Sequence, residues 1–224
     1  MNLRGRLILE AVGTYFLMLV IALVTIRNAP VPEAAFAIGA VLIAIVYAIG
    51  PHSWAHFNPS MSLAFWLRGT MPGREVAPYV IAQVCGALLA VFTQMLLVLP
   101  ESEFIQGVPK PITSLPETNH LSLVIGELLF TFALVFTTLH VATTRLQRGN
   151  AYFGLVVASI VVAGILTMGP VASAVFNPAV QIGFWAMGSG GVTDGVLIVG
   201  SSLVGGALAA FGFRLVHGAS QDPE

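Results

Sequence analysis

Two Asn-Pro pairs hold the side chains of this sequence whose types and spacing are best suited to contact a polar ligand. Asn58-Pro59 and Asn177-Pro178 lie 119 positions apart, within the matching segments FNPSMSLAFW and FNPAVQIGFW. Because Asn is a good N-cap and Pro is tolerated in the first turn, each pair predicts the start of a helix. The two amides can then offer N–H donors, and extended backbone before them can offer carbonyl acceptors, to a polar, uncharged solute.

The composition places these pairs in a lipid bilayer. Charged residues make up 8% of the chain and apolar residues 57%, whereas a soluble domain carries about 25% charge. The formal net charge of −1 and the lack of a basic run exclude nucleic acid as a partner. One cysteine, Cys85, excludes an internal disulfide. No nucleophile–base pair, metal cluster or phosphate loop has usable spacing, so we expect neither an enzyme nor a cofactor.

Two glutamates form a second repeated element upstream of the Asn-Pro pairs. Glu10 and Glu127 each begin a Glu-x-x-x-Thr inside an apolar stretch. A carboxylate at membrane depth is a functional-site candidate, so proton or ion coupling is one interpretation. In the other, each carboxylate accepts backbone hydrogen bonds and holds an Asn-Pro loop in place. His56 precedes Phe57 and is predicted to pack in the loop, since no second metal ligand has suitable spacing.

Six apolar stretches are long enough to cross a bilayer, which takes about 20 residues at 1.5 Å rise each. Two shorter pieces, 58–67 and 177–187, begin at the Asn-Pro pairs and are too short to span, so each is predicted to be a half-helix. The six predicted spans are roughly 7–26, 34–50, 78–99, 121–144, 152–169 and 193–216.

Three spans and one half-helix, repeated once, form an odd-numbered unit, so the second copy must lie upside down. We take 1–110 as the first repeat and 111–224 as the second, with an irregular outer loop over 100–120. The Asn-Pro ends of the half-helices then meet near the midplane. The positive-inside rule places both termini in the cytoplasm. The inner side carries Arg4, Arg6, Arg68, Arg74, Arg145, Arg148 and Arg214, and the outer side carries only Arg27 and Lys110.

On these residues the sequence resembles the aquaporin, or major intrinsic protein, family over nearly its whole length. The resemblance is carried by Gly50, by His56-Phe57-Asn58-Pro59-Ser60, by Asn177-Pro178-Ala179, by Gln83 and by the repeated glutamates. It implies an all-α bundle of six transmembrane helices and two re-entrant half-helices in the cell membrane. It also implies a homotetramer with four pores and passive flow of water or small neutral solutes, a mechanism already described for aquaporins. Finally, it favours the loop-supporting interpretation of Glu10 and Glu127.

The sequence departs from the family pattern at two positions. Ser60 stands where the first motif usually ends in Ala, a change between small residues that we expect to matter little. Val180 stands directly after the second motif, where the family usually has Arg. The family's spacing then implies an outer constriction with no charge and no side-chain hydrogen-bond donor, formed by Ile38, Ile165, Ala174 and Val180.

An apolar constriction favours larger neutral solutes of mixed polarity over strict water selectivity. Without the Arg the constriction is wider, while an apolar ring offers water nothing to bond and can dewet. By resemblance to bacterial family members that lack this Arg, neutral arsenite or a methylated arsenical is a candidate solute. Glycerol is less favoured, because glycerol-conducting relatives usually have Arg-Asp where this chain has Val180-Gln181.

Two other classes of protein remain as alternatives. A secondary transporter also uses inverted repeats and broken helices, but it needs ion-coupling groups, and Glu10 and Glu127 are the only charges at membrane depth. A structural membrane protein with a closed pore is conceivable because the constriction is apolar. Gradient-dependent uptake would favour the first alternative, and absence of any flux the second.

Overall fold

A computed structural model describes residues 1–98 and 119–218, and within these ranges all regular secondary structure is helical. This confirms the predicted all-α class. Most of the outer loop predicted over 100–120, and the predicted repeat boundary after residue 110, lie outside the described residues. The helices are α1 (Leu3–Ile26), α2 (Val31–Ser53), α3 (Pro59–Arg68), α4 (Gly73–Val98), α6 (His120–Thr143), the 3₁₀ turn η1 (Arg145–Gln147), α7 (Phe153–Met168), α8 (Pro178–Ala186) and α9 (Val192–His217).

Five of these helices, α1, α2, α4, α6 and α9, are long and apolar enough to cross a membrane. The remaining predicted span, 152–169, is a shorter apolar helix, α7, of 16 residues. At 1.5 Å per residue it is about 24 Å long, less than the hydrocarbon core of about 30 Å. Pro170 follows its C-cap Gly169 and has no N–H with which to continue the helix. The chain therefore leaves α7 early and turns into the second Asn-Pro loop.

Two helices extend beyond their predicted ends because they continue through a proline close to the terminus. The span predicted over 34–50 continues as α2 past Pro51 to Ser53. The span predicted from 78 begins at Gly73, with Pro78 inside the second turn of α4. Both prolines lie close to a terminus, where a missing backbone hydrogen bond costs less than in the middle of a helix.

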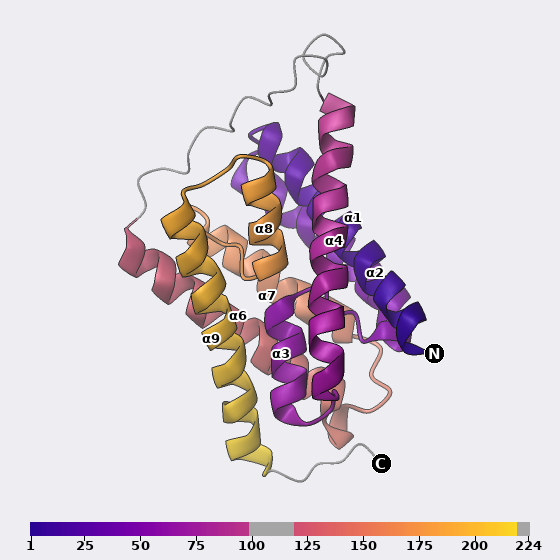
Figure 1. Ribbon diagram of the computed structural model, residues 1–224. Helices are drawn as coiled ribbons and strands as arrows, with labels where there is room; N and C mark the ends of the chain where they lie inside the picture. Colours follow the sequence, from indigo (N-terminus) through magenta and orange to yellow (C-terminus); the bar gives the residue numbers. More distant parts are fainter. Residues whose placement is uncertain (99–118, 219–224) are drawn as a thin grey trace.

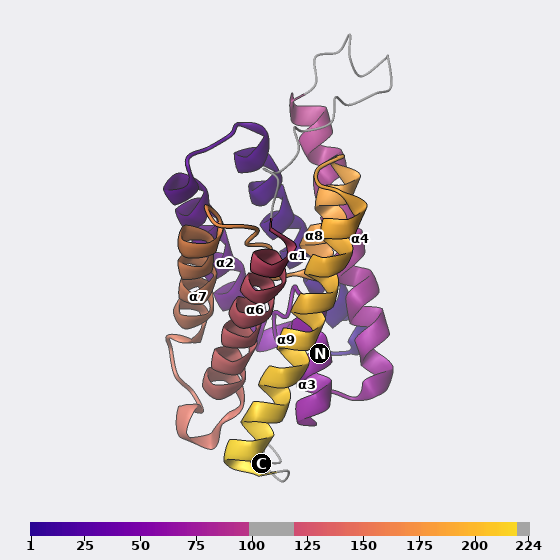
Figure 2. The same ribbon diagram turned by 90° about the vertical axis from the view of Figure 1, so that its left-hand side faces the viewer.

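The two halves of the bundle pack in a reciprocal way (Figures 1 and 2). The most extensive helix packing is between α1 and α4 and between α6 and α9, and these two pairs occupy equivalent places in the two repeats. The half-helix α3 packs more extensively on α9 than on α4 of its own repeat, and α8 packs more on α4 than on α9. In Figure 1, α3 lies in the lower half and α8 in the upper half. Each half-helix is therefore held mainly by the last span of the other repeat.

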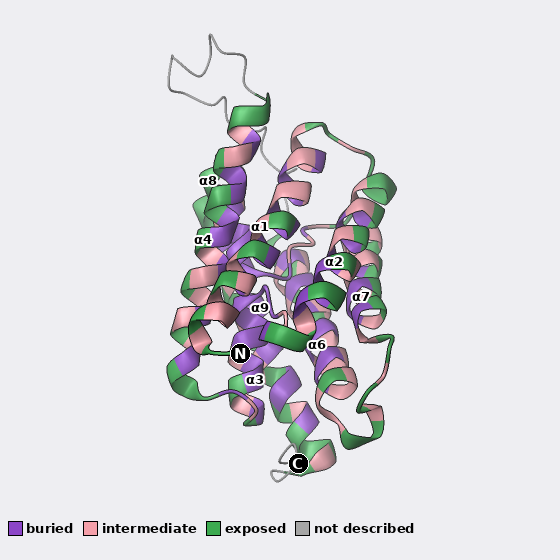
Figure 3. Cartoon of the chain, turned by 90° about the vertical axis from the view of Figure 1, so that its right-hand side faces the viewer, coloured by how far each residue is buried: buried purple, intermediate pink, exposed green. Residues whose placement is uncertain are grey.

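The long helices carry many exposed residues on their outward faces (Figure 3), and large hydrophobic side chains are among them. Most of α3 and α8 is buried, including Ser60, Ala64 and Ala179 with no exposed surface. Large hydrophobic side chains are exposed on the long helices, for example Leu89 at 58% and Phe211 at 53%. This pattern suits a chain whose outer surface faces lipid or another apolar surface rather than water.

Glycines at equivalent positions let the long helices approach closely. A Cβ on Gly86 of α4 would overlap the Ala11 carbonyl of α1, and a Cβ on Gly205 of α9 would overlap the Leu128 carbonyl of α6. Neither obstacle is a side chain that can rotate away. Small residues at such crossings allow backbone-to-backbone packing in membranes.

We expect Gly86→Ala to destabilise the protein by about 1–3 kcal/mol, because the added methyl forces α1 and α4 apart. Gly200→Ala in α9 is the matched control, since a Cβ there meets nothing within 4 Å. Thermal unfolding in detergent, followed by tryptophan fluorescence, should show a lower midpoint for the first variant and an unchanged or higher one for the second. Equal midpoints would show that the crossing is not tight.

Candidate functional site

The N-termini of the two half-helices meet in the interior and are bonded to each other across the repeats. Asn58 caps α3 by accepting from Ser60 N at 2.9 Å, and Asn177 caps α8 by accepting from Ala179 N at 3.0 Å. Asn58 Nδ2 donates to Phe176 O and Asn177 Nδ2 donates to Phe57 O, each at 2.8 Å. An amide NH₂ has two N–H groups, so each asparagine keeps a second donor after this cross-bond. Both asparagines lie on the wall of the cavity described below.

The backbone before each asparagine is strained rather than uniformly extended, which corrects our expectation for these segments. Phe57 (φ 48°) and Phe176 (φ 53°) occupy the left-handed region, as do Trp54 and Ala55. For a bulky side chain this conformation costs on the order of 1–3 kcal/mol, and it persists only where surrounding contacts impose it. The left-handed turn places Phe57 O and Phe176 O where the opposite asparagine can reach them. Asn58 and Asn177 are themselves extended.

Glu10 supplies the contacts that impose the first turn. Its Oε1 accepts from His56 N at 3.0 Å and from Ser53 Oγ at 2.8 Å. Its Oε2 accepts from Phe57 N at 2.8 Å and from Gln83 Nε2 at 2.9 Å. The carboxylate has no exposed surface. Four donors from two helices and the loop therefore converge on one buried group.

Glu127 repeats this arrangement in the second half. Its Oε1 accepts from Val175 N and Ser173 Oγ, each at 2.8 Å. Its Oε2 accepts from Phe176 N at 2.7 Å and from Ser202 Oγ at 3.2 Å. The serines of both networks were missed by the sequence analysis. Ser202 could have been predicted from the repeat, because it lies 119 positions after Gln83, the same spacing that separates the two Asn-Pro pairs.

His56 lies inside the first loop. Its Nδ1 is 3.0 Å from Ser62 Oγ, and its ring packs at 4.3 Å from the ring of Phe65. The ring of Trp54 lies 5.9 Å from that of His56 and 6.5 Å from that of Phe65. It is buried and also lines the cavity.

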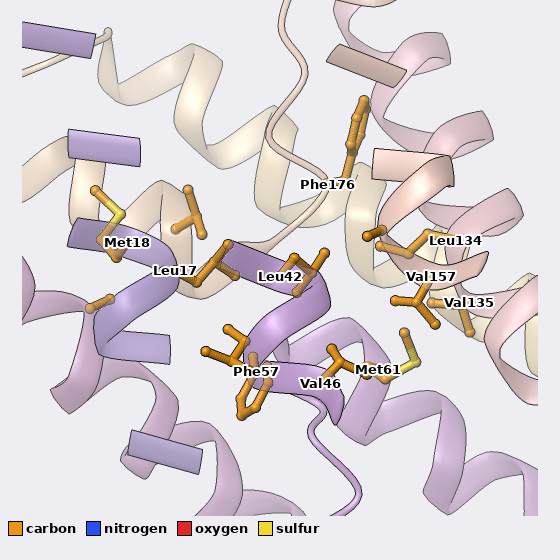
Figure 4. Packing of buried hydrophobic residues seen from close by; sticks show 14 of the residues in the cluster. Leu17, Met18, Leu42, Val46, Phe57, Met61, Leu134, Val135, Val157 and Phe176 are labelled. Carbon is orange, nitrogen blue, oxygen red and sulfur yellow. The ribbon is translucent and has the colours of Figure 1, made fainter. Parts of the chain in front are cut away.

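A cavity of about 790 Å³ runs through the bundle beside this junction. Its walls come from α1, α2, α3, α6, α7 and α8, with Asp194 and Ile198 of α9. Much of the wall is aliphatic, and Figure 4 shows Leu42 and Val46 of the first repeat near Leu134 and Val157 of the second. Toward one end it is lined by residues of the α1–α2 connection, such as Asn28, and toward the other by residues after α6, such as Arg148. It therefore extends along the bundle.

All four positions implied for the constriction lie on this one cavity. Ile38 of α2, Ile165 of α7, Ala174 of the second loop and Val180 of α8 are lining residues. Val180 is 2% exposed and Ile38 is 7% exposed. Ile38 comes from the first repeat and the other three from the second, and all four side chains are aliphatic. The carboxylates Glu10 and Glu127 are absent from the cavity wall, as described by its lining residues.

The chain belongs to the major intrinsic protein family, whose model covers residues 1–213. Members of this family are channels and not enzymes, and this protein is a multi-pass membrane channel. It is 35% identical to aquaporin NIP1-1 of Zea mays over 218 residues, which is 95% of this chain and 74% of the relative. It is 33% identical to nodulin-26 of Glycine max, over 80% of this chain and 65% of the relative. It thus spans about two thirds to three quarters of these relatives.

The fold is similar to that of the aquaglyceroporin of Plasmodium falciparum. The TM-score is 0.79 with 18% sequence identity, over 96% of this chain and 97% of the other. At this identity the similarity establishes the architecture, six transmembrane helices and two half-helices. It confirms the fold predicted from the sequence.

We expect Glu10→Gln to lower stability by at least about 2 kcal/mol. The new amide group points two donors into a site where four donors already converge, and a buried unpaired donor costs about 1–3 kcal/mol. Glu33→Gln is the control, because Glu33 is 55% exposed in its pair with Arg27 and surface pairs contribute little. Thermal unfolding and solute flux in proteoliposomes should both fall for the first variant only. A stable Glu10→Gln protein that keeps full flux would contradict the loop-supporting role.

Proposed function

We propose that the protein is a passive channel for small neutral solutes and that an apolar constriction at Ile38, Ile165, Ala174 and Val180 sets its selectivity. The observation that carries the proposal is Val180, which stands directly after the second Asn-Pro motif on the cavity wall. The family resemblance implies an Arg at this position. With Val in its place, this part of the path offers neither charge nor donor.

The absent charge changes the barrier to ions. At about 5 Å and an effective dielectric of 20, one guanidinium would oppose a passing cation by roughly 3 kcal/mol. Here the half-helix N-termini, each worth about +0.5 charge and converging at Asn58 and Asn177, supply positive potential at the centre of the path. The dehydration cost of an ion in an aliphatic cavity remains. Neutral solutes are therefore favoured over ions.

The aliphatic wall also discriminates among neutral solutes. A molecule that forms several hydrogen bonds loses them at the constriction, at about 1–3 kcal/mol for each group left unpaired. It regains donors at the asparagine junction, where each amide keeps one N–H after its cross-bond. Solutes with few polar groups for their size cross at lower cost than polyols. This supports arsenite or a methylated arsenical as cargo and makes glycerol less favoured.

Stopped-flow light scattering on proteoliposomes tests the proposal through Val180→Arg. We expect the native protein to pass arsenite, and the variant to lose arsenite permeability by about tenfold while keeping water permeability, because the side chain narrows the path and supplies donors to water. Val180→Leu is the matched control, since it adds bulk without charge or donors. It should reduce arsenite and water together.

The contrary outcomes are distinct. A native protein that passes water at ordinary rates and excludes arsenite and organoarsenicals would overturn the assignment of solute. A native protein without any flux would indicate a closed, structural role.

The structure favours a passive channel over a secondary transporter. Glu10 and Glu127, the residues that could couple to an ion, are saturated with hydrogen bonds and lie off the cavity wall. We expect arsenite uptake into proteoliposomes to be the same with and without an imposed proton or sodium gradient. Ionophore collapse of each gradient is the control. A gradient-driven accumulation above the external concentration would show coupled transport instead.

We further propose a homotetramer in the cell membrane with both termini in the cytoplasm. The arginines assigned to the inner side cluster at one end, where Arg6 pairs with Glu75 at 2.8 Å and Arg214 donates to Leu67 O. Arg27 pairs with Glu33 in the α1–α2 connection at the other end. This distribution supports the orientation, while the tetramer rests on the family resemblance. Chemical cross-linking and thiol-accessibility labelling in native membranes report the two properties.

A further inference from the structure

Two histidines from different helices meet at the end of the bundle that carries Arg68. His140 lies in the last turn of α6 and His217 is the last residue of α9. Their Nε2 atoms are 3.1 Å apart, with ring centroids 5.0 Å apart and ring planes inclined by 57°. Both side chains are half-buried, and neither lines the cavity. The pair is thus separate from the conduction path.

We propose that His140 and His217 form a binding site for a late first-row divalent metal ion of the Zn²⁺, Ni²⁺ and Cu²⁺ class. Imidazole nitrogens are preferred ligands for these ions. The two Nε2 atoms are 3.1 Å apart. A metal ion at about 2.0–2.1 Å from each of them would make an N–metal–N angle of about 100°. That angle lies between those of square-planar and tetrahedral coordination. The two rings could therefore bind one ion with little movement.

The hydrogen bond of the other ring nitrogen prepares His140 as a ligand. His140 Nδ1 lies 2.7 Å from Phe136 O, and a carbonyl can only accept, so Nδ1 carries the proton. Nε2 then presents its lone pair toward His217. Histidines that bind metals usually donate their other ring N–H to a carbonyl or carboxylate in this way. In the metal-free pair His217 Nε2 donates to that lone pair, and metal binding moves the His217 proton to Nδ1.

Two phenylalanines pack against the histidine rings, and nearby charges act on a bound cation in opposite directions. Phe136 and Phe213 pack at 4.3 and 4.5 Å against the rings of His140 and His217, respectively. The C-termini of α6 and α9 converge here, and their partial negative charge favours a cation. The guanidinium of Arg68 opposes it from 5.0 Å above the Phe213 ring, and it also donates to Thr143 Oγ1.

Within residues 1–98 and 119–218, no third His, Cys, Asp or Glu joins the pair to complete a larger metal cluster. The remaining coordination positions fall to water. The site is therefore expected to bind more weakly than sites with three or four protein ligands, and to prefer ions that take imidazole over hard ions such as Mg²⁺ and Ca²⁺.

Titration calorimetry of the tag-free protein in detergent, with ZnCl₂ or NiCl₂ at pH 7.5, tests the site. We expect one ion per chain, no binding of MgCl₂ or CaCl₂, and weaker binding at pH 5.5 because protons compete for the imidazoles. His217→Gln should weaken the affinity about 10–100-fold, a loss of the size that misplaced ligands cause. His52→Gln, at an exposed histidine elsewhere, is the matched control and should bind like the native protein.

A second measurement tests directly whether both histidines bind the ion. The electron paramagnetic resonance spectrum of bound Cu²⁺ should show coupling to two nitrogens in the native protein and to fewer in His140→Gln, with thermal unfolding used to confirm that each variant is folded. If the native protein takes up no Zn²⁺, Ni²⁺ or Cu²⁺, or if both histidine variants bind unchanged, the pair is only a hydrogen-bonded contact between α6 and α9.

Discussion

Backbone groups at membrane depth must find their partners inside the protein, because lipid offers none. The half-helices α3 and α8 and the loops before them break the regular helical bonding at the centre of the bundle. Two buried carboxylates satisfy the N–H groups freed at 56–57 and 175–176. These contacts hold Phe57 and Phe176 in a left-handed conformation that neither residue favours by itself. The junction of the two half-helices depends on them.

The inverted repeat makes this arrangement mutual. Each asparagine caps its own half-helix and donates to the carbonyl that precedes the other. Each half-helix is also packed mainly on the last span of the opposite repeat. Neither repeat can therefore form its half of the junction alone. The close glycine crossings at Gly86 and Gly205 bring the long helices near enough for Gln83 and Ser202 to reach the carboxylates.

The functional surface is what remains once these polar groups are satisfied. The glutamates lie off the cavity wall, and that wall is largely aliphatic with the two asparagines and His56 among its polar residues. We propose that Val180, at the position where the family resemblance implies an Arg, changes the chemistry of the path without changing its frame. In this proposal, selectivity and architecture are carried by different residues of the same short motif.

The sequence by itself determined the properties that depend on local pattern. These are the apolar spans, the Asn-Pro helix starts, the repeat, and the odd number of membrane crossings in each repeat that inverts the second copy. The helix ends at Gly73 and Ser53 differed from expectation because each helix continues through a proline near its terminus, where a missing backbone hydrogen bond costs little. Only the tertiary structure decided which donor meets which acceptor. Asn58 and Phe176, or His140 and His217, are far apart in sequence, and no local preference encodes their meeting. Their positions follow from how whole helices pack, and the strain at Phe57 and Phe176 persists only because those long-range contacts over-determine it.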